Sequence, residues 1–321
     1  MAINDFRSNS MSKIDFQDAA AGVHSIDHFA LSVPELPEEE KFLLAFGLRV
    51  ENQGHRLLVR ASASDHVWAV ILPGSGKKLQ YVSMGCYESD LAALRHQVES
   101  AGGTIATPHA QGDTNGFWFR DPDGSLFQVK ATRKTQPDQK SAMPDLSVPS
   151  NTRGAPARSM AKAAMPTRLS HLALFTPDVT RSLTFHTQAL GLRLADRSGD
   201  IIAFTYGRHG SDHHLLAFLK SEGPGLHHPS WDVASVEDCG LANTRLRAAG
   251  YDRHWGPGRH VLGSNYFNYC RDSFGQWWEA SAHIDYIEKD ADWTVANFSD
   301  EDSLYLWGPD VPEDFVANAE I

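Results

Sequence analysis

The chain has 321 residues, a length that suits two domains or one large one. Its 41% hydrophobic content is enough for buried cores, but no apolar stretch approaches the roughly eighteen residues of a membrane span. The net charge of -11 argues against nucleic acid as a partner, and three widely spaced cysteines indicate neither a disulfide framework nor a cysteine-based zinc site. With no signal-like character at the N-terminus, we expect a cytoplasmic protein without a membrane partner.

The first part of the chain predicts a polar tail, a folded domain and a linker. Residues 1–20 are polar and carry no apolar period. Over residues 21–133, short strand-like runs alternate with helix-like segments, one of which, 91–103, closes with a glycine. Residues 134–166 are rich in Pro, Ser, Ala and charge, which is typical of a linker.

A second block, residues 167–285, repeats the same order of elements. A strand leads to a helix that ends near Gly191, short strands follow, and the pattern starts again with a second strand and a helix over 236–249. Residues 286–321 form a C-terminal extension. Short strands with one helix per unit predict an α+β fold of two domains, each built from paired βαβββ modules with a curved, mostly antiparallel sheet.

The two blocks match each other in sequence. Ile26–Val33 matches Leu169–Thr176, and Leu79–Ser83 matches Leu226–Ser230. The register drifts by only a few residues along the chain, which indicates an internal duplication. We therefore expect the two domains to share one fold.

Three polar residues lie at matched places on apolar, strand-like runs of the second block: His171, His228 and Glu279. An ionisable group in such surroundings is costly to bury unless it is paired or bound to a metal. Two imidazoles and one carboxylate make the facial triad that binds non-haem Fe(II) and leaves three positions open. The sequence therefore predicts a metal site, for Fe(II) or for Mn(II), which accepts the same ligands.

The first block provides an internal comparison for this site. At the three matched places it carries His28, Tyr81 and Gln128. Tyr and Gln are poor replacements for a neutral imidazole and a carboxylate, and a set that served packing alone would have little reason to differ there. We expect the second domain to hold the metal and the first to be a scaffold.

The adjacent His227 and His228 need to be distinguished. The repeat aligns Tyr81 with His228. Neighbouring residues of a regular strand point to opposite faces of the sheet, so we expect one of the two imidazoles to face the metal, and we select His228.

From this triad outward, over about residues 24–285, the chain resembles the vicinal oxygen chelate superfamily and, within it, the two-domain extradiol catechol dioxygenases. The most specific feature is Gly258-Arg-His260, with Tyr269 nine residues further on and Glu279 nineteen. The resemblance implies that His260 and Tyr269 contact the substrate. The resemblance also includes the tail Trp307–Phe315, for which we expect no chemistry.

The resemblance further implies an acid/base histidine in the strand before the second metal ligand. His214 matches that place better than His213, and the choice between them stays open. Relatives often carry an acidic residue shortly after the position of His260, and this chain has none there. The sequence therefore does not predict what orients His260.

The activity implied by the resemblance is extradiol (meta) cleavage of a catechol by O2 at non-haem Fe(II), giving a hydroxymuconic-type product in aromatic compound degradation. Catechol and O2 are the expected partners, and a homo-oligomer is the expected assembly. Which catechol is used stays open. Two further sets are candidates, one to line the ring pocket and one to bind a substrate carboxylate: Trp231, Tyr266, Phe267 and Trp277 for the first, and Arg253, Arg259 and Arg271 for the second.

Three alternatives remain at this point. The fold also supports other metal-chelating chemistry, such as hydroquinone ring cleavage or a glyoxalase-like lyase or isomerase. It also occurs in metal-free small-molecule-binding proteins. Finally, a different pairing of modules would let His28 replace His171 in the triad.

Overall fold

The computed structural model describes residues 19–144 and 147–320. In the first half of this described chain, the elements are β1 (Val23–Val33), α1 (Leu36–Phe46), β2 (Arg49–Asn52), β3 (Leu57–Arg60), β4 (Val67–Pro73), β5 (Lys78–Cys86), α2 (Glu88–Ser100), β6 (Thr104–Ala106), β7 (Phe117–Arg120) and β8 (Leu126–Ala131). The strands form one sheet with the order β2-β3-β4-β1-β5-β8-β7-β6.

The second half repeats this order, with one additional short strand, β12, in its middle and further short elements at its end. Its elements are β9 (Arg168–Thr176), α3 (Val179–Leu190), β10 (Leu192–Ser198), β11 (Ile202–Gly207), β12 (Ser211–Asp212), β13 (Leu216–Lys220), β14 (Gly225–Asp232), α4 (Val236–Ala248), β15 (His254–Arg259), β16 (Tyr266–Arg271), β17 (Trp277–Ala282), β18 (Tyr286–Ile287), β19 (Ala296–Asn297) and α5 (Asp300–Ser303). The main sheet has the order β15-β16-β17-β14-β9-β13-β11-β10-β19, and β12 pairs with β18.

The duplication is confirmed at the level of residue pairing. β1 pairs antiparallel with β5 and β5 parallel with β8, as β9 pairs with β14 and β14 with β17. The residues that face one another across these ladders are His28–Ser83–Gln128 in the first sheet and His171–Ser230–Glu279 in the second. Most ladders are antiparallel, so the predicted α+β fold with curved sheets is also confirmed.

The first helix of each half ends in the same way. α1 closes on Gly47 with φ 105°, and α3 closes on Gly191 with φ 64°. Glycine tolerates this left-handed backbone, which turns the chain sharply into the next strand. At the other end of α3, the side chain of Asp178 accepts a hydrogen bond from the Arg181 N–H and caps the helix.

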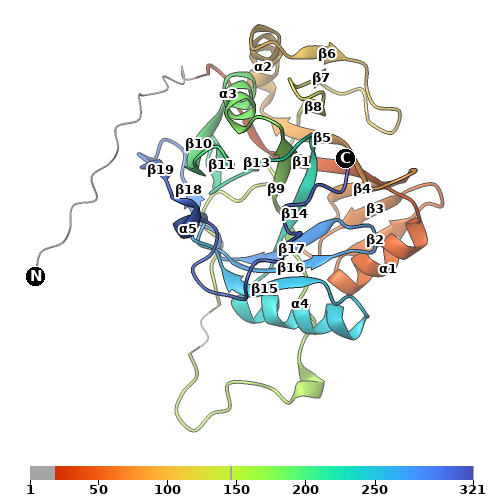
Figure 1. Ribbon diagram of the computed structural model, residues 1–321, viewed down its shortest axis with the longest axis vertical. Helices are drawn as coiled ribbons and strands as arrows, with labels where there is room; N and C mark the ends of the chain where they lie inside the picture. Colours follow the sequence, from red (N-terminus) through yellow and green to blue (C-terminus); the bar gives the residue numbers. More distant parts are fainter. Residues whose placement is uncertain (1–18, 145–146, 321) are drawn as a thin grey trace, which may run out of the picture.

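The two halves are held together by a core that they share, and helices of both halves lie side by side at their junction (Figure 1). α1 packs near α4, and α2 packs near α3, so helices of opposite halves are neighbours. The largest cluster of buried apolar residues draws on both halves. Phe42 of α1, for example, lies with its ring centroid 5.8 Å from that of Trp278 of β17. Each sheet also curves around a smaller cluster of its own.

The segments before β9 and after β17 bear on the proposed domain limits. Between β8 and β9 the described residues contain one short 3-10 helix, Arg158–Met160, and no strand. β18 and β19 follow residue 285 and pair with β12 and β10 of the second half. The limits 21–133, 134–166 and 167–285 stay a proposal.

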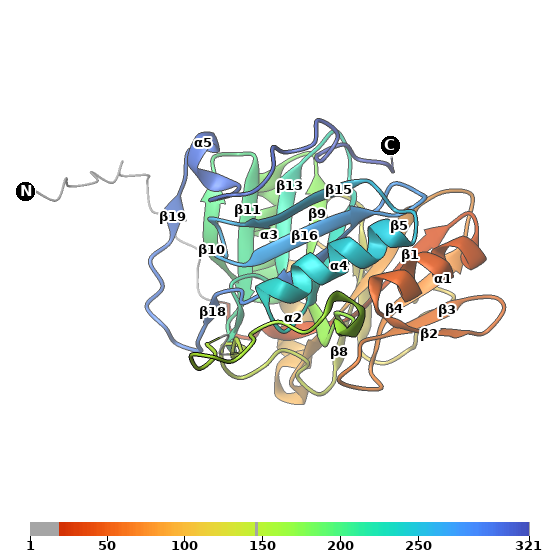
Figure 2. The same cartoon turned by 90° about the horizontal axis from the view of Figure 1, so that it is seen from below.

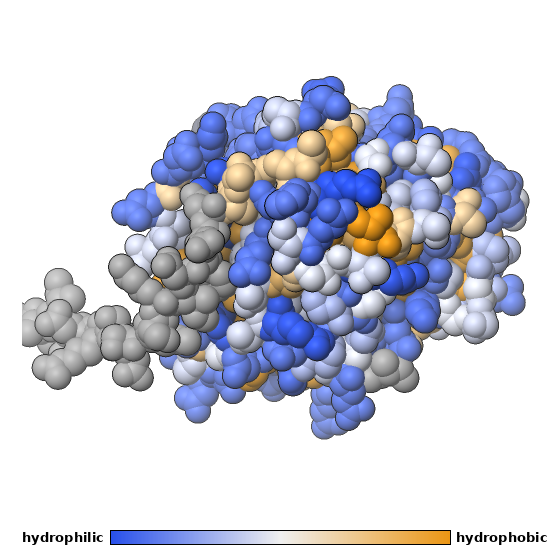
Figure 3. Space-filling view, turned by 90° about the horizontal axis from the view of Figure 1, so that it is seen from above, coloured by the Kyte–Doolittle hydropathy of each residue, from blue (hydrophilic) through white to orange (hydrophobic). Residues whose placement is uncertain are grey.

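The surface on one side of the molecule is mainly polar. Figure 3 shows a face covered largely by hydrophilic residues, with apolar residues in small patches. None of the helices in the described part of the chain has the length and apolar character that a bilayer crossing requires.

Candidate metal centre

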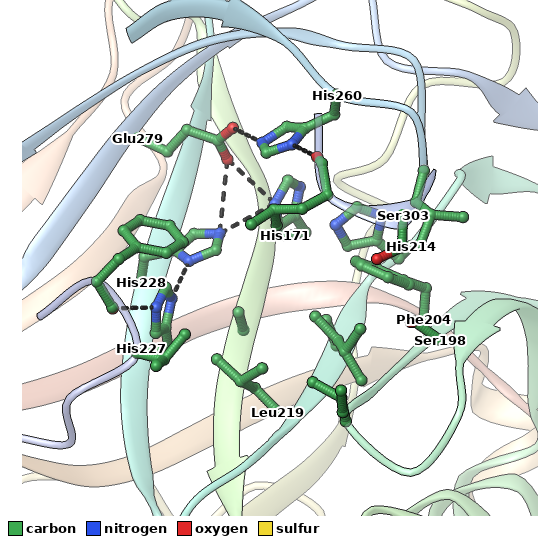
Figure 4. A pocket seen from close by; sticks show the side chains of 18 of the residues that line it. His171, Ser198, Phe204, His214, Leu219, His227, His228, His260, Glu279 and Ser303 are labelled. Atoms are coloured by element: carbon green, nitrogen blue, oxygen red, sulfur yellow. Dashed lines mark hydrogen bonds and ion pairs between the residues drawn. The ribbon is translucent and has the colours of Figure 1, made fainter. Parts of the chain in front are cut away.

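Three neighbouring strands of the second sheet bring His171, His228 and Glu279 together (Figure 4). His171 Nε2 lies 3.2 Å from Glu279 Oε2, His228 Nε2 lies 3.6 Å from the same oxygen, and the two Nε2 atoms are 3.4 Å apart. All three side chains are buried. A point about 2 Å from each of the three atoms exists at the centre of this triangle, and this is the length of a metal–imidazole or metal–carboxylate bond.

The charges of these groups suit a cation. Glu279 Oε2 is buried, and no hydrogen-bond donor satisfies it among the described residues. Burial opposes ionisation of Glu279, but contacts with His171 and His260 outweigh it and hold the pKa of this carboxyl well below its usual range. Burial lowers the pKa of His228 well below its usual range, which leaves a neutral imidazole. The residues present therefore fit a divalent metal ion.

Other side chains fix the orientation of this triangle. His171 Nδ1 lies 3.2 Å from Ser170 Oγ, and that hydroxyl donates to Asp212 at 2.7 Å. Asn265 Nδ2 donates to Glu279 Oε1 at 3.1 Å, which leaves Oε2 for the metal. Such outer contacts hold ligands in place and select the tautomer of an imidazole. Neither Ser170 nor Asn265 was predicted, since a lone Ser or Asn beside a strand carries no signal in the sequence.

The prediction that His227 and His228 face opposite sides of the sheet is wrong. The β9–β14 ladder shifts register between Leu226 and His228, so His227 is an extra residue in a β-bulge. Both imidazoles face the pocket, and their Nδ1 atoms are 2.5 Å apart. His228 directs Nε2 toward Glu279, whereas His227 Nε2 donates to the Phe315 carbonyl at 2.8 Å.

His260 and Tyr269 lie beside the triangle. His260 Nε2 is 3.0 Å from the Tyr269 hydroxyl and 3.6 Å from Glu279 Oε1. His260 Nδ1 donates to the carbonyl of Leu304 at 2.6 Å. The Leu304 carbonyl, directly after α5, therefore orients His260, a role for which the sequence around His260 offers no acidic residue. Leu304 precedes the tail Trp307–Phe315, in which the Phe315 carbonyl accepts from His227 Nε2.

His214 and His213 are clearly different in the structure. His214 lines the pocket, and its ring centroid lies 3.9 Å from that of His171. His213 Nε2 contacts Asp196 at 2.9 Å, and its Nδ1 lies 3.1 Å from His214 Nδ1. The geometry places His214 at the site and His213 behind it.

The pocket that leads to the triangle is lined mainly by apolar side chains. The predicted lining by Trp231, Tyr266, Phe267 and Trp277 is wrong, because these rings pack elsewhere. Most of the apolar side chains that line it come from β11, β13 and the residues after α5, namely Ile202, Phe204, Ala217, Leu219, Leu304, Phe315 and Val316. These residues are ordinary core types, so no sequence signal marked them.

The three arginines do not reach the pocket. Arg253 and Arg271 both pair with Asp314 of the C-terminal segment. Arg259 stacks 5.0 Å over the ring of Tyr266 and donates to a loop carbonyl. Within the described residues, no Lys or Arg lines the pocket. The open question whether these arginines bind a substrate carboxylate is therefore answered by their position outside the pocket lining.

Comparison with known proteins gives this arrangement a family. Residues 168–280 match the model of the glyoxalase/bleomycin resistance protein/dioxygenase superfamily. Metapyrocatechase 2 of Cupriavidus necator is 51% identical over 298 residues, which cover 93% of each chain. The chain belongs to the two-domain extradiol dioxygenases of this superfamily. The predicted ring-cleaving activity is thereby confirmed, and the lyase, isomerase and metal-free alternatives are set aside.

Two solved structures share the fold of this extradiol dioxygenase. The Mn(II)-bound glyoxalase from Novosphingobium aromaticivorans has a TM-score of 0.72 at 26% identity, over 90% of this chain and 92% of that one. The 2,2',3-trihydroxybiphenyl 1,2-dioxygenase of Sphingomonas wittichii has a TM-score of 0.69 at 21% identity, over 91% and 100%. The second likeness shows the fold alone.

The alternative triad with His28 is wrong for this dioxygenase. His28 lies on β1 of the first sheet, where its ring nitrogens contact Asp27 Oδ2 at 2.7 Å and the Tyr81 hydroxyl at 3.1 Å. β9, not β1, is the neighbour of β14. His28 therefore has its own partners and lies in a different sheet from His228.

Proposed function

We propose that this extradiol dioxygenase cleaves a catechol without a charged substituent, using Fe(II) held by His171, His228 and Glu279. The observation that carries the proposal is the triangle of two Nε2 atoms and one carboxylate oxygen without a donor, at the inner end of an apolar pocket. When bound, Fe(II) would supply a Lewis acid with open positions for both catechol oxygens and O2, and a path for electrons between them. The product would be of the hydroxymuconic type.

His214 is the proposed acid/base. Burial, followed by the charge of the nearby His171, lowers the pKa of His214 well below its usual range, so the imidazole is neutral. A neutral imidazole facing the pocket accepts a proton from a catechol hydroxyl and returns it later in the reaction. The contact of His213 with Asp196 fixes the neighbour against which His214 rests.

His260 and Tyr269 are proposed to hydrogen-bond the reacting oxygens. Burial, followed by the negative charge of Glu279, raises the pKa of Tyr269 well above its usual range. Its hydroxyl therefore stays protonated and donates. His260 is anchored through Nδ1 to the Leu304 carbonyl, so Nε2 is the atom presented to the pocket.

The pocket wall supports the substrate class. Phe204, Leu219 and Val316 offer apolar contacts to a ring substituent, whereas Asp300 adds a negative charge among the lining residues. A substrate carboxylate would lose its hydration there without a cationic partner, which costs at least about 1–3 kcal/mol. We therefore expect kcat/KM for catechol and methylcatechols to exceed that for protocatechuate by about tenfold or more.

Reconstitution tests the metal and the reaction together. Apoprotein loaded without air with Fe(II) or with Mn(II) is transferred to aerated buffer with catechol, and oxygen uptake and the colour of the ring-cleaved product are followed. We expect one Fe(II) per chain and uptake with Fe(II). Absence of oxygen uptake with every catechol and both metals would refute the proposal. A strong preference for Mn(II), the metal in the Novosphingobium relative, would overturn the choice of iron alone.

Location and assembly also remain proposals. The three cysteines are free and buried, which accords with a reducing compartment such as the cytoplasm. A homo-oligomer is proposed because most soluble oligomers associate through copies of one chain. Light scattering of the purified protein measures its mass directly, and a mass of one chain would refute that assembly.

A further inference from the structure

The C-terminal strap, defined as residues 304–320, follows α5 and crosses the pocket toward the first half of the molecule. In Figures 1 and 2 it runs from α5 to a C-terminus close to β5. Leu304, Phe315 and Val316 of the strap line the pocket. The strap therefore touches the site at several places and ends where the two sheets meet.

The backbone carbonyl of Phe315, in the strap, determines which ring nitrogen of His227 carries a proton, and through His227 also which nitrogen of His228 does. His227 is buried, and its ring carries an N–H that faces the strap. That N–H lies on Nε2, because Nε2 is 2.8 Å from the Phe315 carbonyl, which only accepts. His227 Nδ1 must then accept from His228 Nδ1 at 2.5 Å. The proton of His228 is thus on Nδ1, and its Nε2 lone pair faces Glu279.

A second strap carbonyl has the same effect on His260. The Leu304 carbonyl accepts from His260 Nδ1 at 2.6 Å. The other ring nitrogen, Nε2, is then the one that faces the Tyr269 hydroxyl. Two histidines of the site, His228 and His260, therefore depend on carbonyls of the same segment for their tautomers.

The far end of the strap is anchored by one carboxylate. The side chain of Glu320 is 4% exposed. Its Oε1 accepts from Lys77 Nζ at 2.7 Å and from the Leu226 N–H at 2.9 Å, and its Oε2 accepts from the Leu79 N–H at 3.0 Å. Leu79 and Leu226 are matched residues of the duplication, so Glu320 bridges equivalent points of β5 and β14.

Gly225, at the start of β14, has no side chain, and this allows the strap to pack closely against the β14 backbone. A Cβ on Gly225 would lie 2.9 Å from Asn318 Oδ1 and 3.0 Å from Glu320 Cδ. Asn318 also donates to the carbonyls of Gly223 and Pro224. Lys77 is itself buried, and besides Glu320 it donates to the Leu226 carbonyl at 2.6 Å. A buried ion pair and a glycine without room for a side chain together indicate a fixed attachment.

We propose that Glu320 is a positioning residue. With Lys77 of the first half it clamps the strap, and through the carbonyls of Leu304 and Phe315 it sets the tautomers of His260 and His228. This inference rests on the proposed metal site. It gives the first half a direct part in the catalytic arrangement, because Lys77 comes from the turn between β4 and β5.

The test is the metal affinity of apoprotein, measured by titration with Mn(II) alone, together with kcat and KM for catechol after loading with Fe(II). Glu320→Gln keeps the shape of the side chain but sets an amide N–H against the surrounding donors. We expect Mn(II) to bind about tenfold more weakly and kcat to fall, since changes outside the ligands of a metal cost about 10–100-fold. Glu313→Gln is the matched control, because Glu313 is an exposed residue of the same strap.

A second variant guards against misfolding. Lys77→Met combined with Glu320→Leu removes both members of this buried ion pair at once, so neither is left facing the other's empty place. It should fold, as judged by thermal unfolding of the apoprotein, and still bind Mn(II) about tenfold more weakly. Wild-type affinity and kcat in both Glu320 variants would overturn the inference, even if their unfolding temperatures fell.

A double-variant cycle separates the proposed relay from a general loosening of the fold. His227→Phe breaks the link between Phe315 and His228 while keeping a ring among aromatic neighbours. We expect Glu320→Gln to have little further effect on Mn(II) affinity in the His227→Phe background, because both act through one chain of contacts. Losses that multiply would overturn the relay. Wild-type protein that binds no Mn(II) or Fe(II) would instead refute the proposed function.

Discussion

The two halves of the molecule present matched residues in different surroundings. In the first half, His28 Nδ1 contacts Asp27 at 2.7 Å and His28 Nε2 contacts the Tyr81 hydroxyl at 3.1 Å, so both ring nitrogens have partners. In the second half, His171 Nδ1 contacts Ser170, but His171 Nε2 faces a carboxylate oxygen. The same strand position is thus closed in one half and open to a cation in the other.

The third position shows the difference most sharply. The Gln128 amide is fully used: its oxygen accepts from Ser83, and its nitrogen donates to Asp113 and to the Asn115 carbonyl. Glu279 has one oxygen held by Asn265 and, within the described residues, no donor to the other. The metal site is therefore recognised both by its residue types and by a carboxylate oxygen of Glu279 that has no hydrogen-bond donor among the described residues.

The largest expected effect comes from giving the second half the residue of the first. Glu279→Gln replaces the carboxylate with a neutral amide. We expect metal affinity to fall by at least about a hundredfold, beyond the range for contacts outside the ligands, and ring cleavage to be lost. Metal analysis and oxygen uptake measure both. Retained metal in this variant would show that the comparison misidentifies the ligand.

The next prediction compares alanine variants of the two matched histidines, His171 and His28. His171→Ala should abolish metal binding. His28→Ala should leave metal content at the wild-type level but lower the free energy of unfolding by about 1–3 kcal/mol, since buried Asp27 and Tyr81 lose a partner. Metal analysis and denaturant unfolding of both variants check this. The opposite pattern would exchange the roles of the two halves.

A transplant into the first half should fail to build a second site. Tyr81→His with Gln128→Glu supplies the missing residue types, but His28 stays paired with Asp27, and Lys130 Nζ lies 2.7 Å from that carboxylate. The ammonium repels a dication, so we expect one metal per chain, as in wild type, and lower stability by about 1–3 kcal/mol. Titration with Mn(II) gives the stoichiometry, and two ions per chain would contradict the expectation.

The smallest expected effect is on pH dependence. Burial opposes ionisation of Asp27, but the contacts with His28 and Lys130 lower the pKa of this carboxyl below its usual value. A lowered pKa in the folded state stabilises the protein above the unfolded pKa of about 4 and loses that stabilisation as pH falls. Asp27→Asn should therefore flatten the decline of stability below pH 4 in denaturant unfolding. An unchanged pH profile would show that Asp27 contributes nothing to it.

The sequence was informative where the repeat constrained it. Matching Tyr81 to His228 predicted the ladder positions that the structure shows, because Tyr81 pairs with Ala30 and His228 with the matched Ala173. It failed at the bulge, because an extra residue in one strand leaves no mark in composition. It also missed the strap, whose contribution comes from the carbonyls of Leu304 and Phe315, and backbone carbonyls have no residue type.

The core that both halves share has a consequence for engineering. A smaller catalyst cut from residues 167–321 would keep His171, His228 and Glu279 but would strip Phe42 and its neighbours from Trp278. The apolar surface exposed by this truncation would promote aggregation, and Glu320 would lose its ion pair with Lys77. A truncated enzyme would therefore need a replacement for the first half. That replacement has to cover the exposed apolar surface and to supply one buried cation in place of Lys77.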